Sequence, residues 1–69
     1  MSNKVYKSIE LTGSSDVSSD QAIQNAIERA SKTVHDLKWF EVIEERGRIE
    51  NGKIESWQVI LKVGFALEE

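Results

Sequence analysis

The spacing of hydrophobic residues changes along the chain, and each spacing predicts an element. In residues 5–12 apolar and polar side chains alternate, with Val5, Ile9 and Leu11 on one face, which predicts a strand that ends at Gly13. In the following segment the apolar positions recur every three or four residues, as on the buried face of an amphipathic helix. The members of this stripe are Ile23, Ile27, Ala30, Val34 and Leu37.

The polar segment before this helix, residues 14–20, is rich in residues that start helices. Ser18 and Gln21 have the spacing of a capping box, and Ser15 and Ser19 are alternative N-caps. Small residues on the helix would let it lie close to a sheet: Ala22, Ala26 and Ala30.

Two long alternating segments, residues 39–50 and 53–67, flank the dipeptide Asn51-Gly52. Asn-Gly is the strongest short signal for a two-residue hairpin with a type I′ turn, and such a turn fixes which residues face one another. Counting outward gives three pairs of opposite charge and two apolar pairs: Glu50–Lys53, Arg48–Glu55, Glu41–Lys62, Val42–Leu61 and Phe40–Val63.

The elements therefore follow the order β-α-β-β. They predict an α+β fold in which a three-stranded antiparallel sheet packs around one helix. The helical crossover returns the second strand parallel to the first, so the first strand pairs with the third, which becomes central. Residues 1–69 are expected to form a single domain.

The sheet face that lies away from the helix is more apolar than a face exposed to water usually is. Counting from the turn places on it, as opposite pairs, Trp39 and Gly64, Ile43 and Ile60, and Glu45 and Gln58. Because glycine has no side chain, nothing covers the indole of Trp39. An exposed aromatic ring beside isoleucines is typical of a subunit interface or a ligand surface, and the residues alone leave both open.

Length and composition limit the ways in which this small domain can be stabilised. A chain of 69 residues buries only about 60% of the surface that its unfolded form exposes, so small domains usually rely on disulfides, a metal or oligomerisation. The chain has no cysteine and a single histidine, His35, which leaves oligomerisation and favours no metal site.

Charge and hydropathy argue against nucleic acids and membranes as partners. With 9 basic and 12 acidic residues and no basic stripe, we expect no nucleic-acid partner. No segment approaches the roughly 18 apolar residues of a membrane helix, and the residues from Met1 to Lys4 lack a secretory apolar core. We therefore expect a cytoplasmic protein without a membrane partner.

The sequence resembles the dodecin family along nearly its whole length. The similar segments are residues 5–7, 10–15, 22–26, 30–33, 39–42, 46–47, 58–59 and 62–68. The resemblance implies a hollow homododecamer that binds flavins (riboflavin, flavin mononucleotide or a lumichrome-type flavin) in pairs between two symmetry-related tryptophans. It also implies that Trp39 stacks on the flavin, that Gln58 hydrogen-bonds its pyrimidine edge, and that Arg46 lies near the pocket mouth.

The positions of these residues bear on how such a site is built. Trp39 and Gln58 share a face, but Gln58 is six residues from Gly64, the partner of Trp39, or about 20 Å along the strand. One ring cannot easily contact both residues of one chain, which favours a site shared between subunits. Arg46 falls on the helix side of a straight hairpin and needs a bulge near Gly47 to reach the site.

Two departures from the family concern phosphate. Many members carry a charged residue, often arginine, where this chain has Ala66, and Glu45 would add negative charge near the site. Both predict that riboflavin binds at least as well as flavin mononucleotide.

The function that the resemblance implies is flavin storage, buffering and protection, not catalysis. The chain offers no cysteine nucleophile, no evident serine–histidine arrangement and no glycine-rich phosphate loop. The alternatives are a structural or partner-binding oligomer and a flavin-dependent oxidoreductase. The sequence leaves open whether coenzyme A is a further partner.

Overall fold

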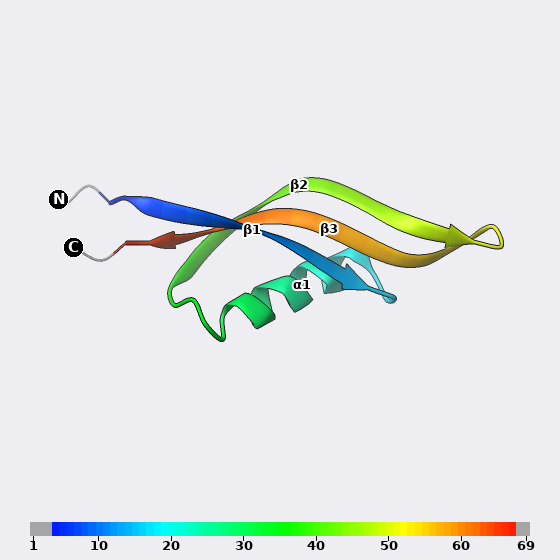
Figure 1. Ribbon diagram of the computed structural model, residues 1–69, viewed down its shortest axis with the longest axis horizontal. Coiled ribbons are helices and arrows are strands. Elements are labelled where there is room, and N and C mark those ends of the chain that lie inside the picture. The colour runs from blue at the N-terminus through cyan, green and yellow to red at the C-terminus, as the bar shows by residue number, and fades with distance from the viewer. Residues whose placement is uncertain (1–3, 68–69) are drawn as a thin grey trace.

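The computed structural model describes residues 4–67, which form one helix and one three-stranded sheet (Figure 1). Along the chain the elements are β1 (Tyr6–Ser15), α1 (Ser19–Ala30), β2 (Leu37–Glu50) and β3 (Lys53–Ala66). β3 is central and pairs antiparallel with both β1 and β2. The predicted fold class, element order and central strand are confirmed. Residues 1–3 and 68–69 lie outside the described part, and with them Glu68 at the end of the last family-like segment.

Helix α1 begins as predicted but ends earlier. Ser18 is the N-cap, and its hydroxyl oxygen accepts a hydrogen bond from the backbone N–H of Gln21 at 3.0 Å. The apolar stripe predicts a helix that continues to Leu37, whereas α1 ends at Ala30 and Leu37 begins β2. That part of the prediction is wrong.

Side chains after Ala30 explain the early end of the helix. The hydroxyl of Ser31 donates to the carbonyl of Glu28 at 2.8 Å, so it competes with regular helical bonding. The backbone N–H groups of Thr33 and Val34 both donate to the Ala30 carbonyl, which closes a tight turn. Asp36 then has a φ of 63°, and this left-handed residue directs the chain into β2.

The hairpin between β2 and β3 has the predicted turn. Asn51 and Gly52 have φ angles of 53° and 75°, as a type I′ turn requires at both central positions. Away from the turn, three irregularities each shift the pairing by one residue, and the one furthest from the turn lies between Leu37 and Trp39. Glu55 and Ser56 together oppose Arg48, and further along Ile43 and Glu44 together oppose Ile60.

These bulges decide which predicted pairs are correct. The pairs outside the shifted segment are confirmed: Glu50–Lys53, Glu41–Lys62, Val42–Leu61, Phe40–Val63 and Trp39–Gly64. Inside it the predicted partners are wrong by one place: Arg48 pairs with Ser56, Glu44 with Ile60, Glu45 with Val59 and Arg46 with Gln58. Counting from the turn assumes a continuous ladder, which a bulge interrupts.

The core lies between α1 and the β1–β3 half of the sheet. It consists of small helix residues and large central-strand residues, all buried: Ala22, Ala26, Val59 and Leu61. A β-carbon on Gly13 would collide with the backbone of Ala22, so this glycine lets α1 lie directly on β1.

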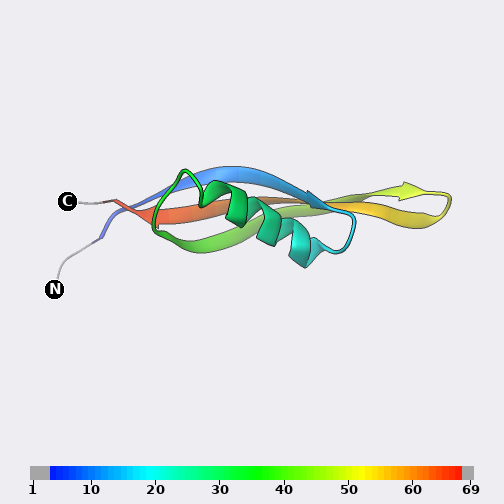
Figure 2. The same ribbon diagram turned by 90° about the horizontal axis from the view of Figure 1, so that it is seen from below.

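Helix α1 covers only part of the sheet. It packs against β1 and β3 (Figure 2). Along β2, only Leu37 is partly buried, and every other residue is exposed. We call the sheet face that carries α1 the helix face and the opposite face the outer face.

The shape of the chain differs from that of a self-contained domain. Its extents are 55 × 21 × 15 Å and its radius of gyration is 14.4 Å, whereas a compact domain of this length has about 11 Å. Its accessible surface is 5362 Å², against about 4,400 Å² expected for a monomeric protein of this mass. The chain therefore exposes about 1,000 Å² more than a compact monomer of its mass.

The described helix is neither long nor apolar enough to cross a membrane.

Candidate functional site

Trp39 lies on the outer face of β2, directly opposite Gly64 of β3. A β-carbon built on Gly64 would collide with the Cε2 and Cζ2 atoms of the Trp39 indole. The ring therefore rests on bare backbone, in space that any other residue at position 64 would occupy. Trp39 is nevertheless 41% exposed. The result is an aromatic platform with one supported face and one accessible face.

Arg46 and Gln58 lie together on the outer face because of the bulges. They form a cross-strand pair, and Nε of Arg46 donates to Oε1 of Gln58 at 3.0 Å. Arg46 also lies 3.8 Å from the carboxylate of Glu44, an ion pair between half-exposed side chains. The expected bulge is present, near Arg48 and Ile49, and it brings Arg46 to the face where the sequence placed Gln58.

Glu45 does not lie where the sequence analysis placed it. It pairs with Val59, which is on the helix face, and so it lies away from Gln58 and Trp39. The acidic residue beside Arg46 on the outer face is Glu44. The sequence predicts a negative charge beside Arg46, and one is present. Glu44 carries it, so the assignment to Glu45 is wrong.

One chain does not bring Trp39 and Gln58 together. The partner of Trp39, Gly64, is six positions from Gln58 on β3, a separation of about 20 Å. Between them the outer face of β3 carries Ile60 and Lys62, and Lys62 lies opposite an acidic residue on each side, Glu10 and Glu41. The outer face is thus a strip with the platform near one end and the Arg46–Gln58 pair further along.

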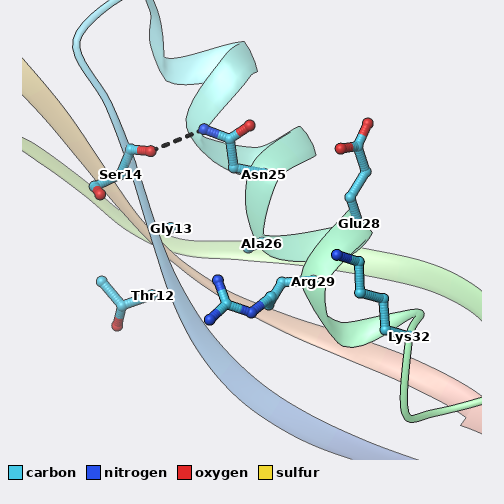
Figure 3. A pocket seen from close by; sticks show the side chains of 8 residues that line it. All are labelled: Thr12, Gly13, Ser14, Asn25, Ala26, Glu28, Arg29 and Lys32. Carbon is cyan, nitrogen blue, oxygen red and sulfur yellow. Dashed lines mark hydrogen bonds between the residues drawn. The ribbon is translucent and has the colours of Figure 1, made fainter.

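A separate groove of about 490 Å³ lies between α1 and the edge of β1 (Figure 3). Asn25 closes one side of it by donating to the carbonyl of Ser14 at 3.1 Å. Two cationic residues one helical turn apart, Arg29 and Lys32, share this groove with Glu28. None of the predicted site residues lies here, so this groove and the candidate site are different surfaces.

The side chains available limit the chemistry. The chain has no cysteine, and His35 is exposed in the segment between α1 and β2. Within residues 4–67 no three His, Cys, Asp or Glu side chains are grouped as metal ligands would be. The outer face offers a ligand an aromatic ring, an amide and charged side chains such as Arg46 and Lys62.

The chain is similar in sequence and in fold to known proteins. The family model described as dodecin matches residues 5–68. The chain belongs to the dodecin family. The Thermus thermophilus dodecin is 52% identical over 66 residues, which cover 96% of each protein. The solved dodecin of Streptomyces coelicolor is 52% identical, with a TM-score of 0.90 over 100% of this chain and 99% of that one.

The family also has a member named for a different ligand. A protein called calcium dodecin from Mycobacterium tuberculosis is 36% identical over 64 residues, which cover 91% of this chain and 89% of that protein. Membership of the dodecin family therefore establishes the fold and a small binding protein. Which ligand binds depends on the side chains of the individual member.

Sequence reasoning missed the contact between Arg46 and Gln58. Both residues were singled out, but a straight register placed them on opposite faces. A glycine at position 47 and a run of three charges before it are the only local signs of irregular pairing. The supporting role of Gly64 was partly visible, because the turn already placed it opposite Trp39.

Proposed function

We propose that this chain binds flavins by stacking their ring system on Trp39, and that it stores, buffers and protects them. The observation that carries the proposal is the indole of Trp39, held on Gly64 and accessible on its other side. A planar, electron-poor ring fits such a platform, and aromatic pairs gain roughly 0.5–1.5 kcal/mol beyond area burial. The dodecin resemblance supplies the ligand class: riboflavin, flavin mononucleotide or a lumichrome-type flavin.

A second copy of the chain completes the proposed site. Trp39 and Gln58 of one chain are too far apart for one ring, whereas a two-fold interface brings Trp39 of one copy toward Gln58 of another. The same symmetry places a tryptophan on each side of a flavin pair. The excess exposed surface supports association, and the resemblance implies a dodecamer.

Arg46 and Gln58 have complementary roles in this proposal. Because the carbonyl oxygen of Gln58 accepts from Arg46, its amide N–H groups remain to donate to the carbonyl oxygens of the flavin pyrimidine ring. Arg46 is held by Gln58 and Glu44, so it positions the amide. With Ala66 offering no charge, phosphate contributes little, and riboflavin binds at least as well as flavin mononucleotide.

Storage and protection require no acid, base or nucleophile. An indole stacked on an excited flavin transfers an electron to it and recovers that electron, which returns the flavin to its ground state without reaction. Enclosure between two indoles also leaves no room for a substrate beside the reactive ring atoms. This second point counts against a flavin-dependent oxidoreductase.

The decisive experiment is purification without added cofactor, followed by absorbance spectroscopy and riboflavin titration. The expected result is strong quenching of riboflavin fluorescence at saturation. An intact oligomer that binds no flavin would overturn the proposal in favour of a structural or partner-binding oligomer. Turnover of a pyridine nucleotide by the flavin-loaded protein would overturn it in favour of an oxidoreductase.

Coenzyme A would need cations for its phosphates, and the groove between α1 and β1 offers Arg29 and Lys32 (Figure 3). Glu28 in the same groove opposes an anion, so we do not include coenzyme A in the proposed function. Cytoplasmic residence stays a prediction from the sequence, which cell fractionation would test.

A further inference from the structure

Gly47 lies inside β2, at a position where a strand normally carries a side chain. A glycine in the interior of a strand costs backbone entropy and packs nothing, so it often marks a bulge or a close approach of two backbones. Gly52 of the turn has a positive φ, whereas Gly47 has not. The backbone conformation of Gly47 therefore does not require glycine, and the reason for glycine here is space.

A carbonyl group of the neighbouring strand takes up this space. A β-carbon built on Gly47 would lie 2.6 Å from the carbonyl oxygen of Ser56. Ser56 belongs to the bulge in β3, where Glu55 and Ser56 together oppose Arg48. Because the obstacle is backbone, rotation of a side chain would not relieve the collision. Glycine at position 47 thus leaves room for the carbonyl group of the bulge.

This bulge decides on which face Arg46 lies. A ladder counted from the turn without a bulge would pair Arg46 with Trp57, on the helix face. With the extra residue in β3, Trp57 pairs instead with Gly47, and Arg46 pairs with Gln58 on the outer face. The hydrogen bond of 3.0 Å from Nε of Arg46 to Oε1 of Gln58 depends on this register.

We propose that Gly47 is a positioning residue of the flavin site. It admits the carbonyl group of Ser56 and so permits the bulge, and the bulge sets Arg46 opposite Gln58. Gly47 has no side chain to offer a ligand, so it acts through Arg46, which holds the amide of Gln58. The effect on flavin binding rests on the proposed function, whereas the effect on the position of Arg46 does not.

The change of register is local, because the second bulge, at Ile43, compensates the first. Trp39 lies opposite Gly64 in the observed ladder, and a ladder counted straight from the turn gives the same pair. A chain without both bulges would therefore keep the aromatic platform and lose the Arg46 contact. Affinity and quenching separate these two parts of the site, since quenching depends on the indole.

Gly47→Ala tests the proposal in the assembled protein. Riboflavin affinity should fall roughly two- to fivefold, as for Arg46→Ala, while the quenching of bound riboflavin at saturation stays unchanged because Trp39 keeps its place. In the Arg46→Ala background, Gly47→Ala should have no further effect, whereas it should have its full effect in the Trp39→Phe background. Unchanged affinity of Gly47→Ala, or a full effect in the Arg46→Ala background, would overturn the proposal.

Deletion of Glu55 supplies a rescue. It removes one of the two residues opposite Arg48, which leaves a continuous ladder in which Arg46 still pairs with Gln58. The bulge carbonyl then no longer needs the space at position 47, so Gly47→Ala combined with this deletion should recover riboflavin affinity. The ion pair lost with Glu55 is exposed and contributes little, so the deletion alone is the control and should leave affinity unchanged.

A combined variant that binds riboflavin as weakly as Gly47→Ala would show that the glycine does not act through the bulge. The combined variant also decides the matter if Gly47→Ala alone does not fold, because the proposal requires the deletion to restore both folding and affinity.

The crystal structure of flavin-free Gly47→Ala separates this inference from the proposed function. The distance from Nε of Arg46 to Oε1 of Gln58 should increase from 3.0 Å to beyond hydrogen-bonding range. If it does, and the unaltered protein binds no flavin, Gly47 positions Arg46 and the proposed function fails. If the unaltered protein binds riboflavin and the variant keeps the hydrogen bond, the positioning role is wrong and the proposed function stands.

Discussion

The two edge strands of the sheet, β1 and β2, pair with the same central strand but have opposite surroundings. β1 lies under α1, which approaches it closely at Gly13, and the core residues lie between this strand, the helix and β3. β2 has no cover, and apolar side chains are exposed on both of its faces. The β1 half contains the buried core of the single chain, whereas the β2 half leaves apolar side chains uncovered.

This contrast separates substitutions that unfold the chain from substitutions that leave it folded but unable to bind or assemble. The boundary runs along the middle of β3, where the helix-face residues Val59, Leu61 and Val63 are fully buried and the outer-face residues between them, Ile60 and Lys62, are more exposed. Substitutions on either side of it test the comparison.

The largest effect is expected in the β1 half. Leu61→Ala removes a fully buried side chain, so it should lower the free energy of unfolding by about 2–5 kcal/mol. Thermal and denaturant unfolding would measure the loss. The control is Val42→Ala, the cross-strand partner of Leu61, which should cost the dissociated subunit about 1 kcal/mol or less. If both variants lost the same free energy of unfolding, the two halves of the sheet would not differ in their contribution to stability.

The next effect concerns the platform. Trp39→Ala removes the stacking surface from both sides of a flavin pair, so riboflavin affinity should fall more than tenfold, about 1.4 kcal/mol, while the oligomer is largely preserved. Trp39→Phe should keep appreciable binding but leave the bound flavin brighter, because phenylalanine is a poorer electron donor. Fluorescence titration beside gel filtration measures both. Unchanged affinity in an intact Trp39→Ala oligomer would contradict the assignment.

A smaller effect is expected when the support of the ring is changed. Gly64→Ala places a methyl group where the indole lies, so Trp39 must tilt, and riboflavin binding should weaken by about 1 kcal/mol. Near-ultraviolet circular dichroism of the tryptophans would report the displacement. Adding Trp39→Phe should make Gly64→Ala less harmful, since the smaller ring needs less space. An unaltered spectrum and affinity would mean that Gly64 does not support the ring.

The smallest effect is expected at Arg46. Arg46→Ala frees the carbonyl of Gln58, so it should weaken riboflavin and flavin mononucleotide alike, by roughly 0.5–1 kcal/mol. The ratio of the two affinities is the measurement that matters. If the phosphorylated flavin binds more than tenfold tighter than riboflavin to the unaltered chain, and Arg46→Ala abolishes that preference, then Arg46 recognises phosphate.

The sequence predicted the topology because several local signals agreed. The alternation in β1, the helical stripe and the Asn51-Gly52 turn each specified one element, and together they allowed one sheet order. The early end of α1 was missed because Val34 and Leu37 continue the apolar spacing, whereas hydroxyl hydrogen bonds and the left-handed Asp36 decide the conformation.

For the candidate site, the sequence placed Trp39 and Gln58 correctly on the outer face and opposed Trp39 to Gly64. It misplaced Glu45 and could place Arg46 only on condition of a bulge. A bulge depends on twist and packing along the whole ribbon, which no short run of residues encodes. Whether Trp39, Gln58 and Arg46 bind a flavin stays a prediction.

The bulge at Ile43 also bears on solubility. β2 is a 14-residue edge strand. An edge of that length presents a row of unpaired backbone N–H and C=O groups, with which strands of other chains can pair, one after another, into an aggregate. A bulge interrupts the row and twists the edge, so strands of different molecules cannot pair along its full length. Deletion of Ile43 would remove this interruption from the middle of the edge, and we expect the variant to aggregate into fibres more readily.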